Sequence, residues 1–322
     1  MSVLVTGWGA TTPTGTEAGD SATLPTAART RLARSERLTQ LLVSAAGPAL
    51  ARAGLADSEG AVRVDLGVSV GTAFGCFLTN VAFEERLLQG GVAAASPRLF
   101  AATVSNAAAG ELAITYRLGG PCTTLTAGRA AGLLALGEAA EMVHAGRATA
   151  MVAAGADALG PALAAFLAVG GLPVSTPLAG GAAALVLETE ASARGRAVTP
   201  YARLRGHAGG FDVRADGTGL RSTVEAALAD ARLEPAAIAR VVTSVPSRLA
   251  DLLAPALSQI FPPPSPSLES LGSSQGETLA AGGVLGVMHA FATSARHEHV
   301  LVVEACGSGH VAAVVIECWG QP

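Results

Sequence analysis

The sequence predicts an α/β protein in which one structural unit occurs twice. Short apolar runs of the kind found in strands alternate with Ala- and Leu-rich stretches of helical length from end to end. Of the 322 residues, 50% are hydrophobic, which is enough for a large core. The stretches "GGAAALVLE" (180–188) and "GHVAAVVIE" (309–317) also match in spacing and in apolar class at nearly every position, which indicates a duplication.

The expected strands are apolar at consecutive positions, as is typical of strands covered on both faces. They are placed at residues 3–10, 65–75, 122–128, 149–156, 181–188, 200–208, 240–245, 299–305 and 310–317. Between them, Ala- and Leu-rich faces predict helices that pack on the sheet. These helices are placed at residues 36–54, 77–90, 102–117, 129–145, 219–233, 247–260 and 278–294.

The duplication predicts two halves, residues 1–190 and residues 191–322, within one integrated domain. A helix of similar length precedes the last strands of each half, at 129–145 and at 278–294. Charged residues and proline return at 191–200, after a long apolar stretch, and mark the division. Two copies whose sheets face each other across shared helices would form a layered, pseudo-symmetric domain.

The charge balance gives no reason to expect nucleic acid or a membrane surface as a partner, because the formal net charge is −4. The uncharged stretch at 158–187 is interpreted as buried core. Its prolines and Gly-Gly pairs would interrupt a lipid-exposed helix, so a membrane span is the weaker alternative.

The four cysteines are widely spaced, and the opening "MSVLVTGWG" enters a strand without a leader. We therefore expect reduced thiols in a cytoplasmic protein. The Ala-, Gly- and Arg-rich composition without lysine favours a bacterial source. No cofactor and no metal are expected, since Pro13 interrupts the glycine-rich opening that is similar to a nucleotide-binding loop.

Several stretches resemble β-ketoacyl synthases, in order over almost the whole chain. They are "VTGWGATTPTG", "LGVSVGTAFG", "SPRLFAATVSNAAAGELAITYRLGGP", "GGAAALVLETEASARGRA" and "VEAALADARLEPAAIARVV". The resemblance implies the thiolase fold, in which two pseudo-symmetric α/β halves form five layers. That expectation agrees with the internal repeat.

The resemblance also implies a catalytic set that this sequence lacks. Arg129 stands where the family has its acyl-accepting cysteine, while Val245 and Glu277 stand where it has two active-site histidines. Gly272 is at about the position of the family's lysine. Decarboxylative condensation needs a thiolate to hold the acyl chain and imidazoles to stabilise the enolate, whereas a guanidinium is always protonated. We therefore expect no catalytic residue for condensation, and degenerate positions instead.

One branch of the family lacks its nucleophile in this way: the chain-length factor, or ketosynthase β subunit, of type II polyketide synthases. The resemblance implies a heterodimer with an active ketosynthase, whose tunnel this chain would shape; a reducing, polyene-making system is the narrower hypothesis. The residues implied at the interface and tunnel are Phe100, Thr103, Val104 and Ala107. The arginines expected to meet an acidic acyl carrier protein are Arg29, Arg31, Arg34 and Arg37.

Arg129 and Glu277 open helices at pseudo-equivalent places, and a buried arginine is costly unless it is paired. We therefore predict an ion pair between them. The alternative is that Arg129 reaches solvent or an interface while Glu277 caps its own helix.

Two other functions remain open. Ser308 or Cys306, with His310 in "ACGSGH", would suit an acyltransferase or hydrolase of the same fold. The second alternative is that the chain is a homodimeric, ligand-binding relative of ketosynthases. Cys306 and His310 also have a spacing seen in metal sites, but two ligands are too few to indicate one.

Overall fold

The computed structural model describes residues 3–12, 26–56, 63, 65–169, 178–245, 247–272 and 276–320. The strands in these ranges form one ten-stranded sheet in the order β3-β2-β4-β5-β1-β6-β10-β9-β7-β8. Their bounds are β1 (Val3–Thr11), β2 (Leu66–Thr72), β3 (Cys122–Thr126), β4 (Ala150–Asp157), β5 (Gly181–Thr189), β6 (Ala202–Phe211), β7 (Ile238–Thr243), β8 (Ser267–Ser270), β9 (His299–Ala305) and β10 (His310–Cys318).

The strand order is pseudo-symmetric about the junction of β1 and β6. Counted outward from this junction, the neighbouring strands on each side are the first, fifth, fourth, second and third strands of that half in chain order. The second strand pairs in parallel with the third and the fourth in both halves, and the remaining pairs are antiparallel. The repeated stretches form β5 and β10, which occupy equivalent places. The halves are joined because Val3, Leu4 and Val5 of β1 pair with β6.

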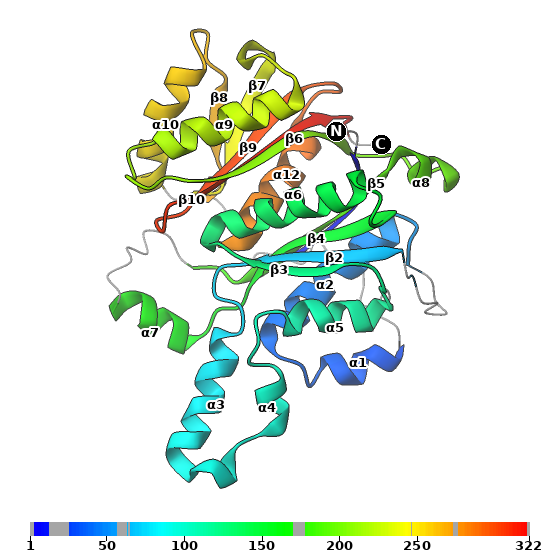
Figure 1. The fold of residues 1–322 in the computed structure, drawn as a ribbon, viewed down its shortest axis with the longest axis vertical. Coiled ribbons are helices and arrows are strands. Elements are labelled where there is room, and N and C mark those ends of the chain that lie inside the picture. The colour runs from blue at the N-terminus through cyan, green and yellow to red at the C-terminus, as the bar shows by residue number, and fades with distance from the viewer. Residues whose placement is uncertain are drawn as a thin grey trace.

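The helices arrange these strands into five layers. Their bounds are α1 (Thr26–Leu32), α2 (Arg37–Arg52), α3 (Phe77–Gly90), α4 (Pro97–Ala101), α5 (Ala107–Tyr116), α6 (Ala131–His144), α7 (Pro161–Val169), α8 (Glu190–Gly195), α9 (Thr218–Ala231), α10 (Ser247–Ile260) and α12 (Ala280–Thr293), with short 3₁₀ turns η2 (Val92–Ala94), η3 (Gly128–Ala130) and η4 (Pro235–Ala237). Helices α6 and α12 lie between the two halves of the sheet, α2 and α5 cover one outer face, and α9 and α10 cover the other (Figure 1). This arrangement confirms the expected fold class.

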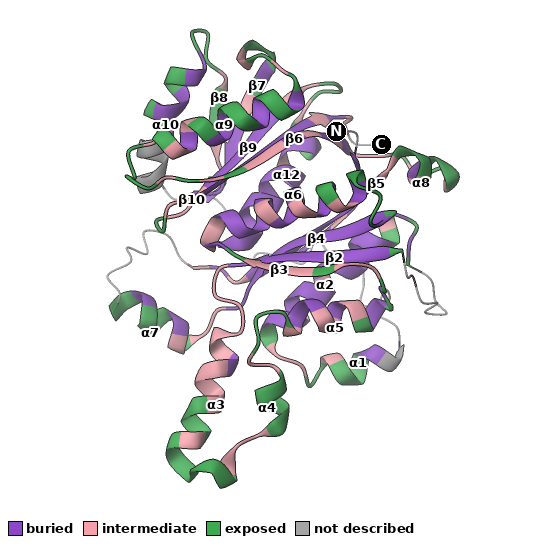
Figure 2. Cartoon of the chain, in the orientation of Figure 1, coloured by how far each residue is buried: buried purple, intermediate pink, exposed green. Residues whose placement is uncertain are grey.

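Small residues let the central helices approach the sheet and each other closely. A Cβ on Gly132 of α6 would stand 2.0 Å from the carbonyl oxygen of Ala280 in α12, and one on Gly155 of β4 would stand 2.1 Å from the same oxygen. A Cβ on Gly71 of β2 would likewise meet the carbonyl of Ala131. The two helices are accordingly among the most buried elements (Figure 2). Glycine is required here by close backbone contact.

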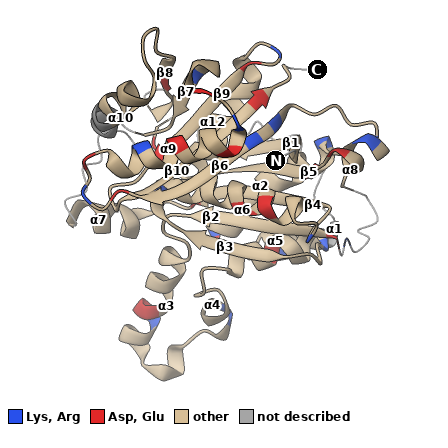
Figure 3. Ribbon diagram, turned by 45° about the horizontal axis from the view of Figure 1, so that its top comes forward, with Lys and Arg blue, Asp and Glu red and all other residues tan. Residues whose placement is uncertain are grey.

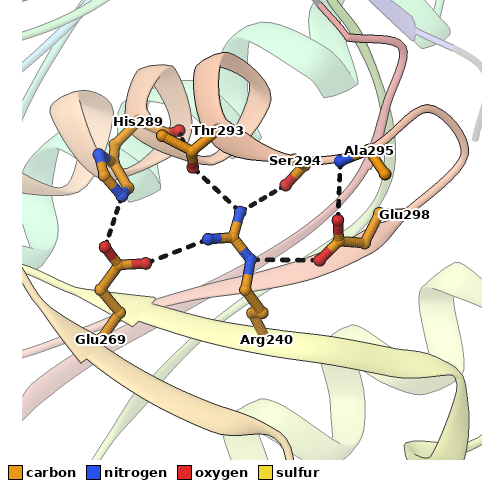
Figure 4. A network of polar contacts seen from close by, with 7 residues as sticks. All are labelled: Arg240, Glu269, His289, Thr293, Ser294, Ala295 and Glu298. Atoms are coloured by element: carbon orange, nitrogen blue, oxygen red, sulfur yellow. Dashed lines mark hydrogen bonds and ion pairs between the residues drawn. The ribbon is translucent and has the colours of Figure 1, made fainter.

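A polar network holds the C-terminal end of α12 against the outer strands of the second half (Figure 4). The guanidinium of Arg240 on β7 pairs with Glu269 on β8 at 3.2 Å and with Glu298 at 3.2 Å. It also donates to the hydroxyls of Thr293 and Ser294 at the end of the helix. The Arg240 side chain therefore links strand β8, the residue before β9 and the end of α12.

Helices α3 and α4 project from the body of the molecule (Figure 1). Thr79 is the buried residue of α3, while Leu88, Val92 and Phe100 in this projection are 87%, 87% and 64% exposed. Charged positions are few along it (Figure 3). The projection therefore leaves several large apolar side chains uncovered, beside the exposed charges of Glu84, Glu85 and Arg86.

The structure contains all the expected strands and adds β8, a four-residue strand in a polar stretch that the sequence reading left as loop. The helix expected at 102–117 begins only at Ala107. Short helices α1, α4, α7 and α8 were not expected.

The largest correction concerns residues 158–187. Strand β5 is buried, but α7 exposes Phe166 and Val169 and buries only Leu163 and Leu167. Buried core was therefore the wrong interpretation for the part that forms α7. Residues 170–177 and Pro13 lie outside the described residues.

None of the helices within the described ranges has the length and apolar character needed to cross a membrane.

Candidate functional site

The turn between β3 and α6 brings Arg129 to the centre of the molecule. Gly128, with φ 58°, makes the left-handed turn that begins η3 and points Arg129 toward the start of α12. There the guanidinium forms an ion pair with Glu277. The side chains are 18% and 3% exposed, so the pair is largely removed from water. The predicted ion pair is confirmed.

Burial governs the electrostatics of this pair. Desolvation raises the pKa of Glu277, and the Arg129 guanidinium opposes that rise through its charge and its hydrogen bond. The backbone of Glu277 is held separately, because its carbonyl accepts a hydrogen bond of 2.8 Å from the amide of Ala179. Removing the cation would therefore leave a fixed, buried carboxylate without its partner.

A second buried carboxylate, Glu304 of β9, feels the charges of the same pair. It is fully buried, and its Oε1 accepts a 2.7 Å hydrogen bond from the amide of Ser244. The net pKa of Glu304 is raised to about 7, mainly by desolvation. The hydrogen bonding from Ser244 and the charge of Arg129 lower this pKa, whereas the charge of Glu277 raises it. The Arg129 guanidinium thus pairs with Glu277 and also lowers the pKa of Glu304 through its charge.

Asp157, at the end of β4, fixes the backbone around the site. It is fully buried and accepts hydrogen bonds from the Thr72 hydroxyl and from the amides of Ala73, Phe74 and Ala280. Burial nevertheless raises its pKa to about 6. The bond to Ala280 secures the first turn of α12 directly after Leu279, whose φ of 52° is rare for a residue with a side chain.

The other degenerate positions offer no reactive group. Val245 is fully buried within the apolar core of the second half. Gly272 lies against it: a Cβ there would stand 2.7 Å from the Ser244 carbonyl and 3.3 Å from that of Val245, so a longer side chain does not fit without movement. Among the described residues, no group of three His, Cys, Asp or Glu side chains is placed to hold a metal ion.

The residues implied at the interface and tunnel follow one another from the last turn of α4, through the connection after it, to the start of α5. Phe100 is 64% exposed and packs on Phe83, with 5.7 Å between ring centroids. The Thr103 hydroxyl donates to the Phe100 carbonyl, Val104 is 53% exposed, and Ala107 begins α5. Phe100 and Val104 are thus exposed, while Thr103 and Ala107 are partly buried.

The four arginines named for carrier recognition are exposed near α1 and the start of α2. Arg31 pairs with Glu111 at 3.1 Å and donates to Thr115, so part of this charge is used within the chain.

The hairpin between β9 and β10 brings Cys306, Ser308 and His310 together. The Ser308 Oγ lies 3.2 Å from the Cys306 Sγ and 3.0 Å from the His310 Nδ1. Residues 305–309 also line a pocket of about 310 Å³. The cluster is next to the Arg129 turn, because a Cβ on Gly128 would stand 2.2 Å from the Cys306 Sγ.

Sequence reasoning missed Glu304 and Asp157. The available signal was an acidic residue in or at the end of an otherwise apolar strand, which marks a buried carboxylate that needs donors. The sequence does not reveal which backbone amides supply them.

Comparison with known proteins gives one family. The model of the β-ketoacyl synthase N-terminal domain matches residues 21–193. No curated protein sequence matches the chain.

Solved structures share the fold over nearly the whole chain. The ishigamide ketosynthase/chain length factor is similar with a TM-score of 0.81 at 23% identity, covering 99% of this chain and 100% of that chain. A β-ketoacyl synthase from Burkholderia phymatum STM815 has a TM-score of 0.84 at 21% identity, covering 98% and 99%. The same values describe AntDE:AntF, a type II polyketide synthase acyl-carrier protein in complex with its ketosynthase bound to the hexaketide.

The buried ion pair predicts strong coupling between its partners. We expect Arg129→Met to lower the free energy of unfolding by about 3–5 kcal/mol, because the Glu277 carboxylate loses its cation. Arg129→Met combined with Glu277→Met should recover most of that loss, since two apolar side chains replace the buried charges. Urea denaturation followed by circular dichroism measures both. The exposed pair of Arg194 and Glu190 is the control, where Arg194→Ala should change stability by about 0.5 kcal/mol or less. A double variant no more stable than Arg129→Met would contradict the coupling.

The buried Glu304 carboxyl predicts a pH dependence of stability. Its native pKa of about 7 lies above its ordinary value of 4.5, so between these values the native state binds more protons than the unfolded state. Stability from this group therefore falls as pH rises through that window. Glu304→Gln removes the titration, so its melting temperature relative to wild type should be higher at about pH 8 than at about pH 5. Glu225→Gln, at an exposed position, should show no such change. An unchanged difference across pH for Glu304→Gln would refute the assignment.

Proposed function

Because the chain belongs to the β-ketoacyl synthase family, we propose that it is a chain-length factor, a ketosynthase-like subunit that does not condense acyl units itself. It would form a heterodimer with an active ketosynthase and shape the tunnel in which the polyketide grows. The setting we propose is a type II polyketide system in the cytoplasm of a bacterium, with a reducing, polyene-making system as the narrower possibility.

One observation carries this proposal: Arg129 and Glu277 form an ion pair, and the resemblance implies that these two residues stand where the family has its nucleophile and a histidine. A guanidinium cannot accept an acyl group, and a carboxylate would repel a developing enolate. With Val245 also apolar and buried, none of these three positions supplies condensation chemistry. The chain has the fold of the family but lacks groups for condensation at these three positions. This combination is expected of a subunit that shapes the tunnel and does not catalyse condensation.

The open edge of the sheet supports a protein partner. Strand β3 pairs only with β2 among the described strands, and it is only partly buried. It contains threonine and leucine, without the proline, lysine or bulge that protects many edges. The uncovered apolar projection of α3 and α4 adds to this surface. We propose that the active ketosynthase covers both, and that Phe100, Thr103, Val104 and Ala107 border its tunnel.

An acyl carrier protein is the second proposed partner. The exposed arginines at 29, 31, 34 and 37 provide positive charge for an acidic carrier. The complex named AntDE:AntF, to which this chain is similar in fold, joins a carrier protein and a ketosynthase.

Co-expression with the ketosynthase encoded beside this chain tests the proposal. The two proteins should co-purify in equal amounts, and polyketide formation should require both. Thr126→Asp, at an exposed position of β3, should reduce co-purification because it places a charge on the pairing edge, whereas Ser267→Asp on the opposite edge strand β8 should not. A stable homodimer, with a ketosynthase that is active without it, would instead favour the homodimeric ligand-binding alternative.

The tunnel role predicts changes in product length. Phe100→Ala removes a large side chain and should lengthen the product, whereas Ala107→Leu should shorten it by filling the same space. Mass spectrometry of the products from the co-expressed pair measures the outcome. Val92→Ala, on the same projection and 87% exposed, is the control and should leave the length unchanged. Unchanged length in both test variants would remove these residues from the tunnel.

A further inference from the structure

The β9–β10 hairpin carries a thiol, a hydroxyl and an imidazole within hydrogen-bond distance of one another, and the proposed chain-length role does not use them. We propose that Cys306 accepts acyl groups from thioesters, with Ser308 and His310 as its proton relay and the adjoining pocket as the site of the acyl chain. This activity is independent of heterodimer formation and of the degenerate positions.

The hairpin geometry brings the three side chains together. The amide of Cys306 donates to the His310 carbonyl at 2.8 Å, and the amide of Gly309 donates to the Cys306 carbonyl at 2.8 Å, which closes a tight turn. Ser308 then lies between the thiol, at 3.2 Å, and the imidazole Nδ1, at 3.0 Å. A nucleophile and a base connected by hydrogen-bond distances form the arrangement needed for covalent catalysis. The edge-on contact of the Phe211 and His310 rings, 5.0 Å between centroids, orients the imidazole.

The pocket beside the hairpin is suited to an acyl chain. Its volume is about 310 Å³, within the range of small-molecule sites. Apolar side chains form most of its wall: Phe211, Val213, Leu220, Leu253 and Val311. Cys306, Ser308 and Asp212 also line it, so the thiol and two polar side chains face a mainly apolar space. An acyl group lying along the apolar wall would present its carbonyl to the thiol.

The other cysteines do not share these features. Cys318 is buried, with its pKa raised by desolvation to about 11. The Cys76 thiol donates to the Thr103 carbonyl at 2.9 Å. Cys122 is exposed on the edge strand β3. Cys306 is the cysteine that combines a pocket with a hydroxyl and an imidazole.

The proposed step is an exchange of one thioester for another. The Cys306 thiol proton passes through the Ser308 hydroxyl to the His310 Nδ1, and the sulfur attacks the thioester carbonyl carbon. The bond between that carbon and the donor sulfur breaks, and the donor leaves as a thiolate that takes the proton from the imidazolium. One carbon–sulfur bond forms and one breaks, so no oxidant or reductant is required. The chain would hold an acyl group without extending it.

Acyl loading is tested with hexanoyl-N-acetylcysteamine as the donor, on the purified protein alone and on its complex with the ketosynthase. Intact-mass spectrometry should show one hexanoyl adduct, which neutral hydroxylamine removes because it is a thioester. Cys306→Ala should abolish the adduct, and Cys122→Ala, which removes the exposed thiol, should retain it. His310→Gln should load at least about a hundredfold more slowly and lose the pH dependence of the wild-type rate.

Several results would overturn the proposal. They are the absence of any adduct, an adduct that persists at the wild-type rate in Cys306→Ala, and an adduct that resists hydroxylamine, which would be an ester on Ser308. Filling the pocket provides an independent measurement: Leu220→Trp should slow hexanoyl loading more than acetyl loading, and equal effects would remove the pocket from the mechanism. Co-purification with the ketosynthase is scored separately, so failure of the chain-length role and failure of acyl loading are distinguishable.

Discussion

A single buried guanidinium determines how the middle of this molecule is built. Arg129 lies within a layer from which water is largely excluded, and its charge is opposed by Glu277 and influences the ionisation of Glu304. Desolvation has the largest effect on the pKa of both carboxyls. This layer is therefore stable only while the ion pair and the hydrogen bonds to the carboxylates are kept. Asp157 adds a further hydrogen bond to this layer, because its carboxylate accepts from the amide of Ala280, the first residue of α12. The close contacts of Gly132 and Gly155 with that helix leave little freedom to adjust.

The chain has the scaffold of the β-ketoacyl synthase family, and within that scaffold the ion pair of Arg129 and Glu277 joins the turn after β3 to the segment that leads into α12. The turn between β3 and α6 brings the Arg129 guanidinium to Glu277, and the Arg129 Nε is left buried without a hydrogen-bond partner. The thiol closest to that turn is Cys306, on a hairpin of the second half, where space and a base are available. The proposed acyl-accepting thiol and the ion pair therefore lie on neighbouring segments.

Sequence reasoning reached the architecture because the evidence for it is local and repeated. Consecutive apolar runs located the main strands, and the match of β5 with β10 located the duplication. The pairing of Arg129 with Glu277 followed from the cost of burying a cation. Other features depend on partners far away in sequence: nothing near Glu304 indicates Ser244 as its donor, and nothing near Asp157 indicates Ala280. Helix α7 was misjudged because an uncharged stretch reads as core even where the fold leaves it exposed.

The junction of β1 and β6 has a consequence for assembly. By joining the halves into one continuous sheet, it leaves the molecule with two terminal strands, β3 and β8, among those described. Strand β8 is four residues long and contains Glu269, whose carboxylate is engaged by Arg240 and His289, so it is a poor template for a further strand. A strand of another chain can therefore be added at the β3 edge of the sheet, whereas the β8 edge does not favour such an addition.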